Sequence, residues 1–158
     1  MDFLNPQNIL SQIELAPGMK VSDFGSGSGD FAILISKAVG QEGAVYAFDV
    51  QESAISSLRS KAKLDGLMNI NLHRANLEVA GSTKLLDGSQ DMVLLTNILF
   101  QVDVKENVFK EAFRVLRKGV VMVMVDWKKE APLGPSRERR LDRFHLIQLS
   151  ESVGFKMQ

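Results

Sequence analysis

The segment that most constrains this chain is residues 21–30, Val-Ser-Asp-Phe-Gly-Ser-Gly-Ser-Gly-Asp. An apolar run from Met19 to Phe24 precedes the glycines, and a helix-like apolar pattern begins at Phe31 after them. This order predicts a strand, a tight glycine turn and a helix. Such a turn lets the backbone come close to a nucleotide-like ligand.

The glycine spacing departs from the dinucleotide fingerprint G-x-G-x-x-G at one position. The third glycine would fall at residue 30, where the chain has Asp30. A carboxylate at a helix N-terminus competes with the pyrophosphate that a dinucleotide places there. Asp23, two residues before the first glycine, adds a second negative charge. S-adenosylmethionine, an adenosine ligand with positive charge, fits this pattern better than NAD.

The segment from Asp23 to Gly29 resembles the first motif of class I S-adenosylmethionine-dependent methyltransferases, (D/E)-x-G-x-G-x-G. Residues 45–49, 91–97 and 113–126 are similar to the family's second strand, fourth strand, and helix with fifth strand. The resemblance covers roughly residues 5–155, and its closest type is the ubiquinone/menaquinone-biosynthesis methyltransferase. It implies methyl transfer from S-adenosylmethionine to a small-molecule acceptor. The catalytic residues stay unknown at this stage.

Composition and alternating helix and strand patterns predict the fold. At 158 residues, with 45% hydrophobic and 24% charged residues, the chain is expected to form one α/β domain over residues 1–158. We expect a Rossmann-like three-layer sandwich with a mostly parallel sheet. The resemblance implies seven strands, but the chain offers no material for the last two. The fifth strand is therefore expected to be an exposed edge, open to homodimer formation.

The expected elements follow from apolar periodicity, capping residues and glycine stops. Helices are expected at residues 5–14, 30–39, 52–65, 103–116 and 138–153, the fourth opening with a capping-box-like start; strands are expected at 19–24, 45–49, 70–73, 92–96 and 120–125. Residues 81–88 fit either a loop or a short helix.

Strand ends and the resemblance together supply the candidate cofactor-binding residues. Asp23 is expected to contact the cofactor's ammonium group, and Asp49, about 20 residues after the last glycine, its ribose hydroxyls. The resemblance places Asn76 where the family usually has an acidic residue that binds the adenine amino group. Asn97 ends the fourth strand, at the edge where ligands bind. The complete set is Asp23, Gly25, Ser26, Gly27, Asp49, Val50, Asn76, Leu77 and Asn97.

Structural alternatives remain open for several candidates. Gly25 and Gly27 could serve only the turn, Asp23 could cap backbone amides, and Asn97 could cap a turn. Trp127 could line an acceptor pocket or pack beneath the loop around Pro132.

Charge and composition narrow the function classes. The formal net charge of +0 gives no reason to expect a nucleic-acid partner. The absence of cysteine excludes disulfides and thiol catalysis, and no metal site is expected. No signal peptide or long apolar run is evident, so we expect a cytoplasmic protein without membrane association. A cofactor-binding domain without activity, a protein or RNA methyltransferase, and a nicotinamide-dependent oxidoreductase remain as alternatives.

Overall fold

The computed structural model describes residues 5–158, and its centre is a parallel sheet in the order β3-β2-β1-β4-β5. Every neighbouring pair of strands runs parallel. The strands are β1 (Lys20–Phe24), β2 (Ala44–Asp49), β3 (Ile70–Arg74), β4 (Gln90–Thr96) and β5 (Leu116–Val125). The expected Rossmann-like α/β fold is confirmed, with five strands in the described residues.

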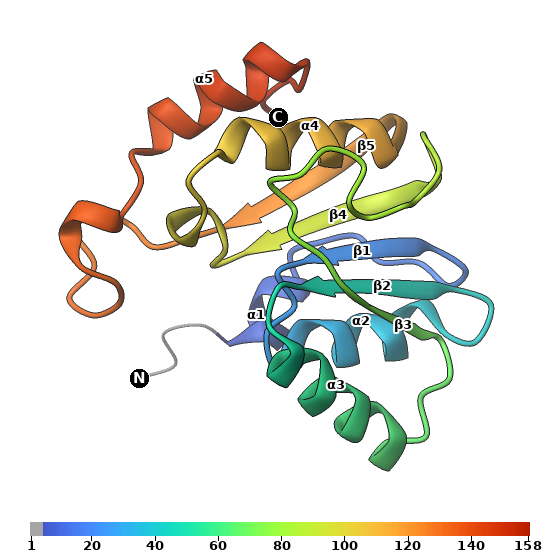
Figure 1. The fold of residues 1–158 in the computed structure, drawn as a ribbon. Helices are drawn as coiled ribbons and strands as arrows, with labels where there is room; N and C mark the ends of the chain where they lie inside the picture. Colours follow the sequence, from blue (N-terminus) through green and yellow to red (C-terminus); the bar gives the residue numbers. More distant parts are fainter. Residues whose placement is uncertain (1–4) are drawn as a thin grey trace.

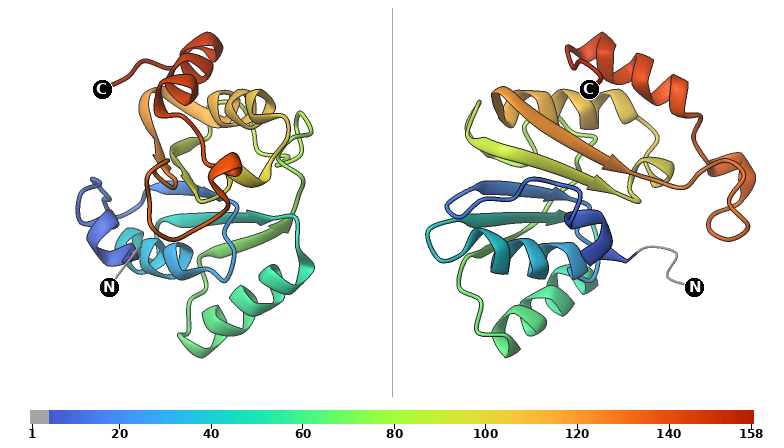
Figure 2. Two further views of the ribbon diagram at one scale, coloured as in Figure 1. Left: turned by 90° about the vertical axis from the view of Figure 1, so that its left-hand side faces the viewer. Right: turned by 180° about the vertical axis from the view of Figure 1, so that it is seen from behind.

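Helices cover both faces of the sheet and complete three layers (Figures 1 and 2). The α-helices are α1 (Pro6–Leu10), α2 (Asp30–Val39), α3 (Glu52–Leu64), α4 (Lys105–Val115) and α5 (Arg143–Val153), and the 3-10 helices are η1 (Leu99–Gln101) and η2 (Arg137–Arg139). Helices α2 and α3 lie on one face, with α1 beside α2, while α4 lies on the other with α5 packed against it. A hydrophobic cluster fills the space on each side.

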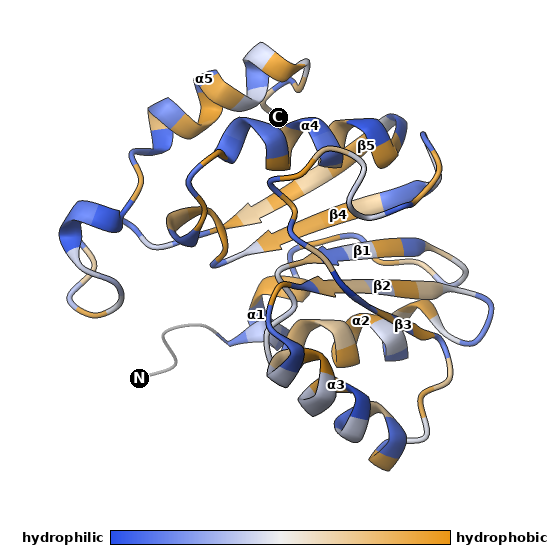
Figure 3. Cartoon of the chain, viewed as in Figure 1, coloured by the Kyte–Doolittle hydropathy of each residue, from blue (hydrophilic) through white to orange (hydrophobic). Residues whose placement is uncertain are grey.

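The central strands form where the sequence is apolar on both faces, as parallel sheets require. Residues Met92 to Leu95 of β4 are all buried, and Figure 3 shows hydrophobic residues along β4 and β5. Helix α2 begins and ends where the glycine pattern predicts. A Cβ on Gly29 would overlap the side chain of Leu58, so Gly29 allows α3 to pack closely against the glycine turn.

The sheet order creates a switch point between β1 and β4. The chain builds outward from β1 to β2 and β3, then returns to the other side of β1 to form β4 and β5. The loops after β1 and β4 therefore leave the sheet in opposite directions. Ligands of open α/β sheets bind in the crevice that this divergence leaves at the carboxyl ends.

Side-chain hydrogen bonds end the first helix earlier than expected. The side chain of Asn5 caps α1 by accepting from the backbone N–H of Gln7 at 2.9 Å. At the other end of the helix, the side chains of Ser11 and Gln12 both donate to the carbonyl of Asn8. These bonds occupy a carbonyl of the last turn, so α1 ends at Leu10 rather than continuing to residue 14.

Two further helix starts differ from the sequence prediction. The prediction of a capping-box-like start at residues 103–106 is wrong. Helix α4 has Val104 as its N-cap residue and has no side-chain cap of its own. The Val104 side chain is 48% exposed. The predicted helix 138–153 is divided into η2 and α5. Arg140 lies between them in extended backbone and donates to the carbonyls of Lys129, Ala131, Leu133 and Pro135. Residues 81–88 form turns without a helix.

Candidate functional site

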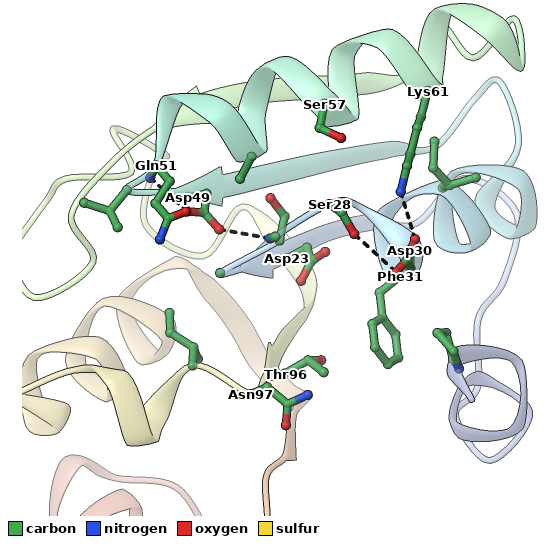
Figure 4. Close-up of a pocket in the computed structure, with 18 of the residues that line it drawn as sticks. Asp23, Ser28, Asp30, Phe31, Asp49, Gln51, Ser57, Lys61, Thr96 and Asn97 are labelled. Atoms are coloured by element: carbon green, nitrogen blue, oxygen red, sulfur yellow. Dashed lines mark hydrogen bonds and ion pairs between the residues drawn. The ribbon is translucent and has the colours of Figure 1, made fainter. Parts of the chain in front are cut away.

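A cavity of about 1240 Å³ opens at the switch point, between the loops after β1, β2 and β4. Figure 4 shows Asp23 and Asp49 on one side of it and Thr96 and Asn97 on the other. Every candidate residue from the sequence lines this cavity: Asp23, Gly25, Ser26, Gly27, Asp49, Val50, Asn76, Leu77 and Asn97. Residues separated by up to about half of the chain thus meet in one site.

The glycine turn forms the wall of the cavity next to β1. Gly25 and Gly27 have φ angles of +79° and +52°, which L-residues with side chains rarely adopt. The backbone N–H groups of Gly25 and Ser26 donate to the carbonyl of Phe48 and tie the turn to β2. A Cβ on Gly25 would lie 2.7 Å from Ile98 Cδ1, whereas a Cβ on Gly27 would meet nothing within 4 Å. Gly27 therefore leaves open space where a ligand can approach the backbone.

Asp23 is the most unusual group in the site. It is 1% exposed, and within residues 5–158 neither of its carboxylate oxygens accepts a hydrogen bond. Burial, followed by the negative charge of Asp49, raises the pKa of Asp23 to about 7. The alternative that Asp23 caps backbone amides is therefore wrong. A buried carboxylate without a donor is costly, and a cationic ligand group would relieve that cost.

Asp49 has a structural role that the sequence did not reveal. Its Oδ2 accepts from the backbone N–H of Gly27 and its Oδ1 from that of Gln51, both at 2.9 Å. The carboxylate thus holds the glycine turn against the end of β2. Each oxygen keeps a lone pair for a further donor.

Asn97 and Thr96 place two more polar atoms without partners at the cavity. Asn97 has a φ of +53° and its N–H donates to the carbonyl of Val125. Among the described residues, Asn97 Oδ1, Thr96 Oγ1 and Ser26 Oγ are buried without a hydrogen bond. The Asn97 side chain therefore caps no turn. Thr96 was missed from the sequence, although its position next to Asn97 at the strand end was a usable signal.

The segment after β3 forms a third wall. Asn76 Oδ1 accepts from the backbone N–H of Glu78 at 3.0 Å, so this oxygen already has one donor, while its amide nitrogen keeps two N–H groups for a ligand. Leu77 is 4% exposed and Val50 is exposed at the rim. Glu78 also lines the cavity and was missed, because nothing in its local sequence sets it apart.

Other side chains near the site have structural partners. Asp30 accepts from Ser28 Oγ at 3.3 Å and pairs with Lys61 at 3.1 Å, so its charge at the start of α2 is partly offset. Trp127 does not line the cavity, and its ring lies against Gly134, in agreement with packing beneath the loop around Pro132.

Residues 5–158 show neither a metal-binding cluster nor a membrane-spanning helix. No group of three or more His, Cys, Asp or Glu side chains is arranged to hold a metal ion. No helix in this part of the chain is long and apolar enough to cross a membrane.

Fold and cavity together define a Rossmann-like domain with a glycine-turned ligand site at its switch point. The chain belongs to the methyltransferase domain family, whose family model matches residues 15–151.

Individual relatives agree with this assignment. The chain is 27% identical to the ubiquinone/menaquinone biosynthesis C-methyltransferase UbiE of Vibrio parahaemolyticus, over 83% of this chain and 50% of that protein. It therefore spans about half the length of the curated relatives it matches.

Two solved structures are also similar. A SAM-dependent methyltransferase from Aquifex aeolicus has a TM-score of 0.88 and 27% identity, over 98% of this chain and 81% of that one. The arsenic(III) S-adenosylmethionine methyltransferase CrArsM from Chlamydomonas reinhardtii has a TM-score of 0.77 and 26% identity, over 89% and 52%.

Proposed function

We propose that this chain binds S-adenosylmethionine in the cavity between β1 and β4 and transfers its methyl group to a small-molecule acceptor. The observation that carries the proposal is Asp23, a fully buried carboxylate that lies beside an open glycine turn and has no hydrogen-bond donor among residues 5–158. S-adenosylmethionine has an ammonium group that such a carboxylate can bind, next to an adenosine that suits the rest of the cavity. NAD lacks an ammonium group and brings a pyrophosphate toward the Asp30 carboxylate.

The remaining walls suit the other parts of this ligand. The free lone pairs of Asp49 can accept from ribose hydroxyls, and the open face of Gly27 lets the ligand pass close to the backbone. Asn76 and the buried Leu77 offer N–H donors and an apolar surface to the base. Asp23 then holds the amino-acid end.

Bound S-adenosylmethionine supplies a methyl group on a good leaving group, the sulfonium. The chain's own contribution is then to orient the two reactants in line and to exclude water. Buried Phe31 and half-buried Ile98 line the same cavity as the polar groups, so part of its wall is apolar. This environment favours displacement at a methyl group over competing reactions with water.

Methyl transfer is tested with S-adenosylmethionine carrying a tritiated methyl group and a cell extract separated into small-molecule, protein and RNA fractions. We expect the label in the small-molecule fraction, and its loss with the Asp23→Asn variant. Label in protein or RNA would contradict the proposed acceptor class. Binding of the ligand with no transfer to any fraction would favour the inactive cofactor-binding domain.

A further inference from the structure

Glu78 joins the wall of the cavity to the start of α4. Its Oε1 accepts hydrogen bonds from the backbone N–H groups of Asp103 at 2.7 Å and Val104 at 2.6 Å. Its backbone carbonyl accepts from the side-chain amide of Asn107, in the first turn of the helix, at 2.8 Å. A cavity-lining residue thus has three hydrogen bonds to the first turn of α4 and the two residues before it, 25 or more residues further along the chain.

The bond to Val104 satisfies the N–H group of the N-cap residue of α4, a helix that has no side-chain cap of its own. The first N–H groups of a helix have no partner within it, and a side-chain oxygen usually satisfies one of them. Val104, the N-cap residue, has no side-chain acceptor. The Glu78 carboxylate instead binds the N-cap N–H group from a distant segment, where negative charge is also favourable toward the helix dipole.

The backbone of Glu78 is part of the turn that forms the cavity wall. The N–H of Glu78 donates to Asn76 Oδ1 at 3.0 Å, and the N–H of Val79 donates to the carbonyl of Asn76 at 3.1 Å. Residues 76–79 therefore form one hydrogen-bonded turn. Because Glu78 lies within it, the position of this turn depends on the bonds to α4.

We propose that Glu78 is a positioning residue for the cofactor, fixing residues 75–78 to α4 so that they present an ordered surface to the adenine. This inference rests on the proposed function, which places the base against these residues. Coupling of this kind is reciprocal. A ligand on Asn76 and Leu77 should therefore slow amide exchange at Asp103 and Val104, neither of which lines the cavity.

Glu111 provides a matched control on the same connection. It accepts from the backbone N–H groups of Gly81 at 3.0 Å and Thr83 at 3.3 Å, and it also anchors the loop to α4. Unlike Glu78, it does not line the cavity. Loss of Glu111 should loosen the fold without disturbing the adenine surface.

The test is calorimetric titration of S-adenosylhomocysteine into the wild type, Glu78→Ala, Glu78→Gln and Glu111→Gln, with thermal unfolding of each. We expect Glu78→Ala to raise Kd about 5–10-fold, because the free wall must be ordered on binding. Glu78→Gln keeps one acceptor oxygen and should stay within about 3-fold of the wild type. Glu111→Gln should unfold at lower temperature yet keep Kd within about 2-fold.

The inference is overturned if folded Glu78→Ala binds like the wild type, or if Glu111→Gln weakens binding as much. If Glu78→Ala does not fold, exchange in the wild type decides: unchanged exchange at Asp103 and Val104 on ligand binding refutes the coupling. If the wild type does not bind S-adenosylhomocysteine, the proposed function is contradicted instead. The hydrogen-bonded connection between Glu78 and the start of α4 is then tested by amide exchange at residues 75–78, which must be faster in Glu78→Ala than in the wild type.

Discussion

Among single residues, Asp23 destabilises the unliganded fold at neutral pH and, in our proposal, binds the ammonium group of the ligand. Its pKa rises from 3.8 to about 7 on folding, so the folded state holds this proton more tightly than the unfolded chain. Stability therefore falls as pH rises from about 4 to 7, and the whole loss is present above that range. The carboxylate remains because, in our account, the ligand's ammonium group offsets its cost.

The variant Asp23→Asn should consequently stabilise the unliganded protein at alkaline pH. From the pKa shift we expect a gain on the order of 2–4 kcal/mol near pH 8 and almost none near pH 3. Denaturant unfolding at both pH values measures this difference. A variant less stable than the wild type near pH 8 would mean that the Asp23 carboxylate has a partner in solution.

The same variant should bind the ligand more weakly. A hydrogen bond to a charged group contributes about 1.5–3 kcal/mol, so we expect at least a tenfold rise in the Kd of S-adenosylmethionine. Wild-type affinity should also fall as the pH drops below about 7, where Asp23 takes up a proton. Methylthioadenosine, which lacks the ammonium group, serves as the control and should bind with little dependence on either change. Equal losses for both ligands would place the ammonium group elsewhere.

The open space beside Gly27 should be where the ligand approaches the backbone. Gly27→Ala and Gly66→Ala both put a methyl group at a position of positive φ with free space around it, at a cost of about 1–2 kcal/mol. Only Gly27 lines the cavity. We expect similar losses of stability but a loss of S-adenosylhomocysteine binding in Gly27→Ala alone, measured by calorimetry beside thermal unfolding. Normal binding by Gly27→Ala would show that the ligand does not approach this turn.

Sequence reasoning found Asp23, Asp49, Asn76 and Asn97 because each lies at or just after the end of a strand. It could not find the hydrogen bonds of Asp49 to Gly27 and Gln51, since these depend on how the turn folds back over β2. Asp49→Ala therefore removes a structural support together with any ribose contact, so a fall in affinity alone cannot assign its role.

Among the elements, α4 anchors the connection between β3 and β4 through Glu111. This side chain is 2% exposed, yet hydrogen bonds from Arg114, Thr83 and Gly81 outweigh its burial and lower its pKa to about 2. A lowered carboxyl pKa stabilises the fold above the unfolded value of 4.5 and ceases to do so as pH falls toward 2.

We therefore expect Glu111→Gln to cost roughly 2–3 kcal/mol of unfolding free energy at neutral pH, with the difference from the wild type shrinking between pH 4.5 and 2. Denaturant unfolding at a series of pH values measures both quantities. A difference that does not change over this pH range would mean that packing, and not the Arg114 ion pair, is what the variant loses.

The sequence predicted helix boundaries well where the signal is local and poorly where it is distant. Helix α2 runs between Gly29 and Gly40 as expected, because both glycines mark the ends in the chain itself. The start of α4 depends on Glu78, and the break before α5 depends on the carbonyls that Arg140 binds. No spacing rule along the chain reports such contacts.

At the scale of the whole molecule, β5 lies at the edge of the sheet. Its apolar residues pack into both faces: Met122 contributes to the cluster on the α4 side and Val123 to that on the α2 side. Met122 therefore does not face outward, and Met122→Lys would disturb the core instead of the edge. Within residues 5–158, no strand pairs with the outer backbone of β5.

We predict that the 158-residue chain self-associates through this edge, because unpaired backbone groups on an apolar strand favour pairing with another strand. Sedimentation across the micromolar range should show a dimer whose proportion rises with concentration. Amide exchange on β5 should slow over the same range. A monomer at every concentration, with rapid exchange on β5, would contradict the prediction.

The most direct test of the central claim is calorimetry of the unaltered chain with S-adenosylmethionine, S-adenosylhomocysteine and NAD side by side. The buried Asp23 and the Asp30 carboxylate at the start of α2 both favour the first two ligands, although Lys61 partly offsets the charge of Asp30. We predict saturable binding of both S-adenosyl ligands and little or no binding of NAD. Tight binding of NAD, or no binding of either S-adenosyl ligand, would contradict the account.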